Sequence, residues 1–236
     1  MCGSSVLVLT RWLLVWVCAS CACVMALLGG HLSPAWLLGQ PKSITAPTVK
    51  HLDIQDKLSA WDIDEVMVRP SLGLWLRCGV MGSKNALFLH CGVYATVVPD
   101  VPSAQIAAMV LIVCGTALAV FACVLSFFTT CFRAMKGKSL INLIGALQAL
   151  AGILCLLGLL LLPLSWNSRR VQNLCGPTAS EFNLANCTPG WAMFSLLGGS
   201  VGLLLCTLLS FKADLSTTTD IIDDQIRRGK NVIFLL

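Results

Sequence analysis

The sequence predicts a mainly α-helical membrane protein with four transmembrane helices and a small, disulfide-linked extracellular β-sheet. Hydrophobic residues make up 57% of the 236-residue chain and charged residues only 11%, whereas soluble domains are about one quarter charged. Four uncharged apolar stretches are each long enough to cross a bilayer, which takes roughly 20 helical residues. The two loops predicted to lie outside carry two cysteines each. We therefore treat residues 1–236 as a single tetraspan domain.

The predicted spans follow the uncharged stretches of the chain. The first could instead be a cleaved signal peptide, because a basic residue, Arg11, precedes it. Signal peptides have apolar regions of about 7–15 residues, and this stretch is longer, so we expect an uncleaved span. The four spans are expected at about 12–30, 106–128, 140–164 and 190–211.

Basic residues indicate the orientation of the chain. The connection at 133–139 carries Arg133, Lys136 and Lys138 and no acidic residue. Short loops rich in lysine and arginine stay in the cytoplasm. We therefore expect a multi-pass protein of the plasma membrane or an endomembrane. Its loops at 31–103 and 165–189 are then extracellular, and both termini, with the tail at 212–236, are cytoplasmic.

Four of the 13 cysteines lie in the predicted outer loops: Cys78, Cys91, Cys175 and Cys187. An even number in an oxidising compartment indicates two disulfides, for which three connectivities exist. We favour Cys78–Cys91 and Cys175–Cys187, because each pair closes a short loop. The sequon at Asn186 is a possible glycosylation site on the same side, although its middle residue is a cysteine and it lies near the membrane.

Residues around the first cysteine pair alternate as in a β-hairpin. In "SLGLWLRC" at 71–78, every second residue is a leucine until Cys78, which predicts one strand with an apolar face. Setting Cys78 opposite Cys91 brings the apolar faces of the two strands together and places the turn at 84–85.

No motif for an enzyme, a metal ion or a cofactor is found. The three histidines share no ligand spacing, and the "GKS" at 137–139 lacks the glycine that a phosphate-binding loop has five residues earlier. "CASCAC" at 18–23 has metal-like spacing, but a thiolate within the membrane is costly, so we expect apolar packing. We predict no catalytic, cofactor-binding or metal-binding residues and no nucleic-acid partner.

Small residues at four-residue spacing predict close helix packing. Such pairs let two helix backbones approach, either inside the bundle or at a self-association face. Gln148 is the deepest polar side chain and is expected to hydrogen-bond across helices, with a place in a transport path as the alternative. The small-residue pairs are Gly115 with Ala119, Gly145 with Ala149, and Gly198 with Gly202.

The C-terminus ends in the apolar sequence "VIFLL", after a predicted short helix within 216–228. Phe234 and Leu236 alternate as a PDZ-type peptide would require for strand addition to a cytoplasmic partner. The alternative is an apolar end that lies on the membrane.

Several motifs resemble known tetraspan proteins. "GLWLRC" at 73–78, followed by Cys91, is similar to the Gly-Leu-Trp-x-x-Cys…Cys signature of claudin-like tetraspans. "SPAWLLG", the second-loop pattern and the tail "DDQIRRGKNVIFLL" resemble the lipoma HMGIC fusion partner-like tetraspan family. The match covers most of the chain outside residues 40–70. The motif residues are Trp36, Gly73, Leu74, Trp75, Cys78, Cys91, Trp166, Cys175, Gly176, Cys187 and Trp191.

This resemblance implies a claudin-like fold, in which a left-handed four-helix bundle carries a small extracellular sheet. It also implies a non-enzymatic protein. Members of the family act as accessory subunits that assemble with other integral membrane proteins, including channels and receptors. A claudin-like role at cell contacts of epithelial membranes is the alternative.

Overall fold

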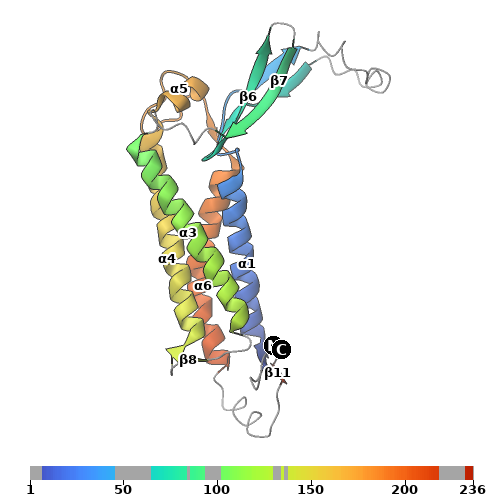
Figure 1. Cartoon of the computed structure of the whole chain (residues 1–236), viewed down its shortest axis with the longest axis vertical. Coiled ribbons are helices and arrows are strands. Elements are labelled where there is room, and N and C mark those ends of the chain that lie inside the picture. The colour runs from blue at the N-terminus through green and yellow to red at the C-terminus, as the bar shows by residue number, and fades with distance from the viewer. Residues whose placement is uncertain are drawn as a thin grey trace, which may run out of the picture. The chain divides into compact units, whose positions relative to one another are not determined.

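The structure is a computed structural model, and four helices among its described residues are long and apolar enough to cross a membrane (Figure 1). These helices, a small antiparallel sheet and its disulfide confirm the predicted fold class. The helices are α1 (Arg11–Leu32), α3 (Ser103–Phe128), α4 (Leu140–Leu161) and α6 (Trp191–Thr217). The residues described are 7–45, 65–83, 86–93, 102–129, 134–135, 138–217 and 232–235.

The chain divides into two compact units, which we describe separately. The helical unit comprises Met1–Gly29, Ala107–Leu161 and Phe194–Leu236. The sheet unit comprises Gly30–Ile106 and Leu162–Met193.

All four helices contribute to the core of the helical unit. Its buried residues include Trp16 of α1, Ala122 of α3, Ile144 of α4 and Cys206 of α6. Large apolar side chains such as Phe121 are exposed on the outer faces. In a membrane protein such faces meet lipid, so the apolar exterior carries no hydrophobic penalty.

Small residues bring these helices close together. A Cβ atom at Gly115 of α3 would lie 2.6 Å from the Sγ of Cys155 in α4. A Cβ atom at Gly202 of α6 would lie 2.5 Å from the Sγ of Cys23 in α1. At Gly115 the backbone of α4 is also close, with the carbonyl oxygen of Ala151 at 2.9 Å, so glycine is needed there for the observed helix spacing. At Gly202 the close atom belongs to the Cys23 side chain.

Helix α6 continues beyond the predicted end of the fourth span at 211. Its last turns include Asp214, which accepts hydrogen bonds from Ser139 Oγ (2.5 Å) and Asn142 Nδ2 (2.8 Å). Because these bonds attach the polar extension to the start of α4, the helix persists where hydropathy alone indicated a tail.

The sheet unit contains a five-stranded antiparallel sheet with the strand order β10-β2-β5-β6-β7. Two of its strands, β6 and β7, are labelled in Figure 1. A separate antiparallel pair joins β3 (Lys42–Thr45) to β4 (Glu65–Val68). The strands of the larger sheet are β2 (Leu37–Leu38), β5 (Ser71–Leu72), β6 (Leu76–Ser83), β7 (Ala86–Val93) and β10 (Thr188–Pro189).

The predicted register of the hairpin is confirmed, because Cys78 of β6 lies opposite Cys91 of β7. The predicted turn at 84–85 lies outside the described residues. The prediction of one strand over 71–78 is wrong. The chain bends at 73–75, and β5 turns back onto β6, so that Ser71 itself pairs with Cys78.

Two short strand pairings occur among the described residues of the helical unit. β8 (Ala134–Met135) pairs with β9 (Lys138–Ser139) in the antiparallel sense. β11 (Val232–Leu235) pairs in parallel with β1 (Leu7–Thr10) and sets Phe234 opposite Leu9. The C-terminal segment is therefore paired over these four positions. The helix predicted within 216–228 falls mostly outside the described residues, and α6 ends at Thr217.

Candidate functional site

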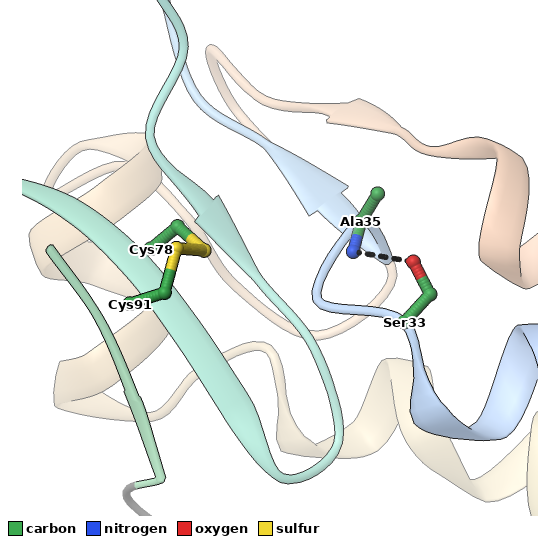
Figure 2. The surroundings of a disulfide bond; sticks show 4 residues. All are labelled: Ser33, Ala35, Cys78 and Cys91. Atoms are coloured by element: carbon green, nitrogen blue, oxygen red, sulfur yellow. Dashed lines mark hydrogen bonds between the residues drawn. A yellow bond between two sulfur atoms is a disulfide. The ribbon is translucent and has the colours of Figure 1, made fainter. Parts of the chain in front are cut away.

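The sheet unit brings most of the predicted motif residues together and is the candidate functional site. Two disulfides hold it. Cys78–Cys91 joins β6 to β7, and Cys175–Cys187 joins the end of α5 (Arg169–Cys175) to the segment before β10. Both predicted pairings are thus confirmed. Figure 2 shows the first disulfide near the turn after α1, where the backbone N–H of Ala35 donates to Ser33 Oγ (3.1 Å).

The second disulfide lies in a small apolar core. Cys175 and Cys187 are buried with Leu37 of β2, Val171 of α5 and Ala179. Gly176 follows α5 with a φ of 109°, a conformation that suits glycine, and its N–H donates to the carbonyl of Gln172 (2.8 Å). The cross-link and this core together hold α5 and the return segment as one folded piece.

Trp36 anchors the segment that follows α1. Its side chain is buried, and its indole Nε1 donates to the carbonyl oxygen of Gly30 in the last turn of α1 (2.7 Å). A buried tryptophan needs a partner for this N–H group. The bond therefore fixes how the chain leaves the helix and enters β2.

The Gly-Leu-Trp motif forms the bend at 73–75. Gly73 N–H donates to the carbonyl of Leu76 (2.7 Å), which closes the bend. A Cβ atom at Gly73 would lie 2.5 Å from the carbonyl oxygen of Ser33 and 2.8 Å from the Cα of Pro34. The position is thus limited to glycine by a backbone on its other side, and the adjacent Leu74 is buried.

Trp75 lies in the bend and not on a strand face as predicted. Its indole Nε1 donates to Nε2 of His31 (3.0 Å), and the two ring centroids lie 5.7 Å apart. An imidazole that accepts through Nε2 is neutral and carries its proton on Nδ1. His31 was missed in the sequence because its partner is distant in the chain and belongs to no ligand pattern.

A small cavity of about 40 Å³ lies among the motif residues of this unit. It is much smaller than the pockets of roughly 300–1,000 Å³ that hold drug-sized ligands. Its size and apolar lining are those of a packing defect, or of a recess for one apolar group. The residues around it include Trp36, Gly73, Leu74, Gln105, Trp166 and Met193.

The remaining residues predicted in the second loop are at the surface. Asn186 is exposed, as a glycosylation acceptor must be, and Trp191 is 58% exposed at the start of α6. Trp166 is half-buried beside the cavity. Of these three, Trp166 packs against the disulfide-linked core.

Gln148 belongs to a separate, fully buried network in the helical unit. It accepts from Trp16 Nε1 (3.1 Å) and donates to Ser20 Oγ (2.8 Å), and Ser20 Oγ donates to the Trp16 carbonyl (2.8 Å). Because both ends of the amide are used to join α4 to α1, the network has the features of a structural link. Trp16 and Ser20 were not predicted as partners of Gln148, because the sequence of α1 is almost uniformly apolar.

The predicted packing residues have different surroundings. Gly115, Ala119 and Gly145 are buried between helices, and Ala149 is half-buried. Gly198 and Gly202 do not share a contact: Gly202 faces α1, whereas Gly198 is exposed and no atom lies within 4 Å of its Cβ position.

Two of the three thiols of "CASCAC" contact other helices, whereas Cys18 is exposed. Cys21 Sγ lies 3.5 Å from Cys123 Sγ in α3, and Cys23 Sγ lies 4.0 Å from Cys206 Sγ in α6. Among the residues that the structure describes, no group of three or more potential metal ligands occurs. These pairs are contacts of the packed bundle.

Comparison with known proteins assigns the chain to a family. The profile of the family described as "Lipoma HMGIC fusion partner-like protein" matches residues 10–214. The chain is 33% identical over 231 residues to "LHFPL tetraspan subfamily member 2a protein" of Danio rerio, covering 94% of this chain and 96% of the relative. It is 34% identical over 173 residues to "LHFPL tetraspan subfamily member 2 protein" of Homo sapiens, covering 71% and 75%. Member 4 of Bos taurus is 23% identical over 82 residues.

Proposed function

Because the chain belongs to the lipoma HMGIC fusion partner-like tetraspan family, we propose that it is a non-enzymatic accessory subunit. In this role it binds other integral membrane proteins, such as channels or receptors, through its helix faces and its sheet unit, and assists their assembly. The proposal places the sheet unit outside the cell and both termini in the cytoplasm. Its expected location is the plasma membrane or an endomembrane.

Gly198 of α6 is the observation that carries this proposal. Glycine inside a helix costs roughly 1 kcal/mol relative to alanine. Gly199 and Gly202 offset this cost through close contact with α1. Gly198 has no such contact, since its Cβ position is open. No close contact within the described bundle requires a glycine at this position. This supports the proposal that another helix packs closely against Gly198.

The surroundings of Gly198 suit a partner helix. Phe194, Leu197, Val201 and Leu205 are exposed on the same side of α6, at the spacing of one helix face. Small residues flanked by large apolar ones form the notch into which a second transmembrane helix packs. The partner is therefore an apolar helix with a small residue, or a narrow side chain, at its crossing point.

The test compares two substitutions in tagged protein purified in mild detergent from cells that normally express it. Gly198→Leu fills the notch, and it should reduce stoichiometric partners several-fold while expression stays normal. Ala146→Leu adds similar bulk at an exposed position of α4 and should leave partner recovery unchanged. Equal recovery from both variants would contradict the docking face. Recovery of no other membrane protein with the unaltered chain would contradict the accessory role.

A claudin-like role at cell contacts is a second candidate, favoured by the edge of the sheet. Among the described strands, β7 pairs with β6 on one side and with no strand on the other. Such an edge can accept a strand from a neighbouring molecule, including a second copy of this chain. This role predicts enrichment at cell–cell contacts and a changed paracellular resistance, which the accessory role does not require.

Two finer features complete the proposal. Asn186 is a candidate for N-glycosylation, supported by its exposure and by the outward side proposed for its loop. The C-terminal segment is a candidate PDZ ligand, but β11 would first have to leave β1, because strand addition uses the same backbone groups.

A further inference from the structure

Phe182 stands out in the loop at 165–189, all of which is described. The other large apolar side chains of this loop, Trp166, Val171, Leu174 and Leu184, are buried or half-buried. Phe182 is 67% exposed. A single exposed apolar side chain is common on protein surfaces, so the exposure of Phe182 gains weight only together with its backbone conformation.

The backbone at Phe182 is also unusual. Ser180 and Asn183 exchange two backbone hydrogen bonds (3.1 and 2.9 Å), which makes residues 181–182 the centre of a tight turn. The φ of Phe182 is 60°, in the left-handed region that glycine or asparagine normally occupies at this position of a turn. A bulky residue is strained there. The chain therefore presents a phenylalanine where folding alone favours glycine.

The surrounding contacts make this turn rigid. Asn183 Oδ1 accepts from the N–H of Ala185 (3.0 Å), and the Cys175–Cys187 disulfide encloses the whole segment. The N–H of Phe182 donates to the carbonyl oxygen of Pro163 (3.3 Å). This last bond fixes the depth of the turn, because Pro163 belongs to the apolar span Leu140–Ser165.

The length of that span sets the level at which Phe182 lies. The span consists of the 22 residues of α4 and a four-residue 3₁₀ helix, Leu162–Ser165. At about 1.5 and 2.0 Å per residue these extend about 41 Å, whereas the hydrocarbon core is about 30 Å thick. The final residues of the span therefore reach the zone between the acyl chains and the headgroups. Aromatic side chains are favoured in this zone, and the exposed Glu181 and Asn183 beside Phe182 can remain among the headgroups.

We infer that Phe182 is a membrane-interface anchor, which the tight turn at 180–183 directs into the bilayer that holds this chain. The occupant of its exposed surface is lipid of the adjacent leaflet. The anchor couples the second loop to the membrane surface and so restrains the disulfide-linked core behind it. A protein partner with an apolar pocket is the competing occupant, and the experiment below separates the two.

The test places the photo-crosslinking residue p-benzoylphenylalanine at position 182 in the full chain within native membranes, with mass analysis of the adducts after illumination. The same residue at His90, an exposed position of β7, is the control. We expect lipid adducts at position 182 to be several-fold more abundant than at position 90. Adducts mainly to another protein or to a second copy would overturn the inference, as would equal lipid adducts at both positions.

Two further variants keep the test decisive if the bulky probe disturbs the turn. Phe182→Trp should add a blue-shifted emission component that brominated lipids quench and aqueous iodide does not. The reverse quenching pattern would contradict the anchor. Phe182→Gly should fold and reach its membrane as the unaltered chain does, because glycine suits the observed φ. Misfolding of this variant would show that the side chain serves the core of the loop instead.

Discussion

Gly73 and Gly79 lie in the same stretch of the sheet unit, but an added methyl group would meet different surroundings at the two positions. At Gly73 it would overlap the backbone of Ser33 and Pro34, which are held in the turn after α1. At Gly79 no atom lies within 4 Å. Comparing substitutions at these two glycines therefore separates the effect of a steric clash from the general effect of replacing a glycine.

We therefore expect Gly73→Ala to destabilise the sheet unit by about 1–3 kcal/mol, the usual cost of overpacking. Gly79→Ala should be neutral or slightly stabilising, because it restricts the unfolded chain without a clash. Thermal unfolding in detergent and surface biotinylation measure both effects. Equal behaviour of the two variants would show that the close approach at Gly73 is not needed for folding.

The hydrogen bonds of Gln148 are expected to stabilise the contact between α4 and α1. Gln148→Leu removes the acceptor for Trp16 and the donor to Ser20. Hydrogen bonds between membrane helices contribute about 0.6–2 kcal/mol, so the free energy of unfolding in SDS titrations should fall by that amount. In a double-mutant cycle with Trp16→Phe, the second substitution should add little, since both remove the same bond. Full additivity would mean that the two side chains do not interact.

Among the elements, the hairpin β6–β7 was predictable and the bend before it was not. Alternation together with two cysteines sets the register, because a shift by one residue would reverse every side chain. The bend at 73–75 depends on the backbone near Ser33 and on the bond from Trp75 to His31. His31 lies in the last turn of α1 and Ser33 directly follows the helix, and a local pattern contains no information about either.

Loss of the Cys78–Cys91 disulfide is expected to destabilise the β6–β7 hairpin. Cys78→Ser should destabilise the unit by about 2–5 kcal/mol and retain the protein inside the cell, as surface biotinylation would show. The double variant Cys78→Ser/Cys91→Ser should be no worse, because the same bond is lost once. Cys114→Ser, which alters an exposed thiol of α3, is the control. Normal surface delivery of both hairpin variants would show that the cross-link is dispensable.

For the whole molecule, composition and charge were sufficient to predict the four helices but not their ends. Hydropathy placed the end of the fourth span at 211, whereas the bonds of Asp214 to Ser139 and Asn142 extend α6 to Thr217. The motif residues of the sheet unit were predictable as a set through their resemblance to a family. Their contacts and the strained turn at Phe182 were not, because each depends on residues brought together by the fold.

The orientation of the whole chain can be tested directly. Basic residues gather at one end of the helical unit, where Arg11 and Lys212 both lie over the ring of Trp12, at 5.6 and 5.3 Å from its centroid. Lysine and arginine favour the cytoplasmic side, and the disulfides require an oxidising compartment. A short epitope inserted after Pro177, an exposed residue of the second loop, should therefore bind antibody on intact cells, or in the lumen if the protein is intracellular. A tag at the C-terminus should become accessible only after the plasma membrane is permeabilised. The opposite labelling would reverse the orientation. The sheet unit, and the leaflet next to Phe182, would then lie on the cytoplasmic side.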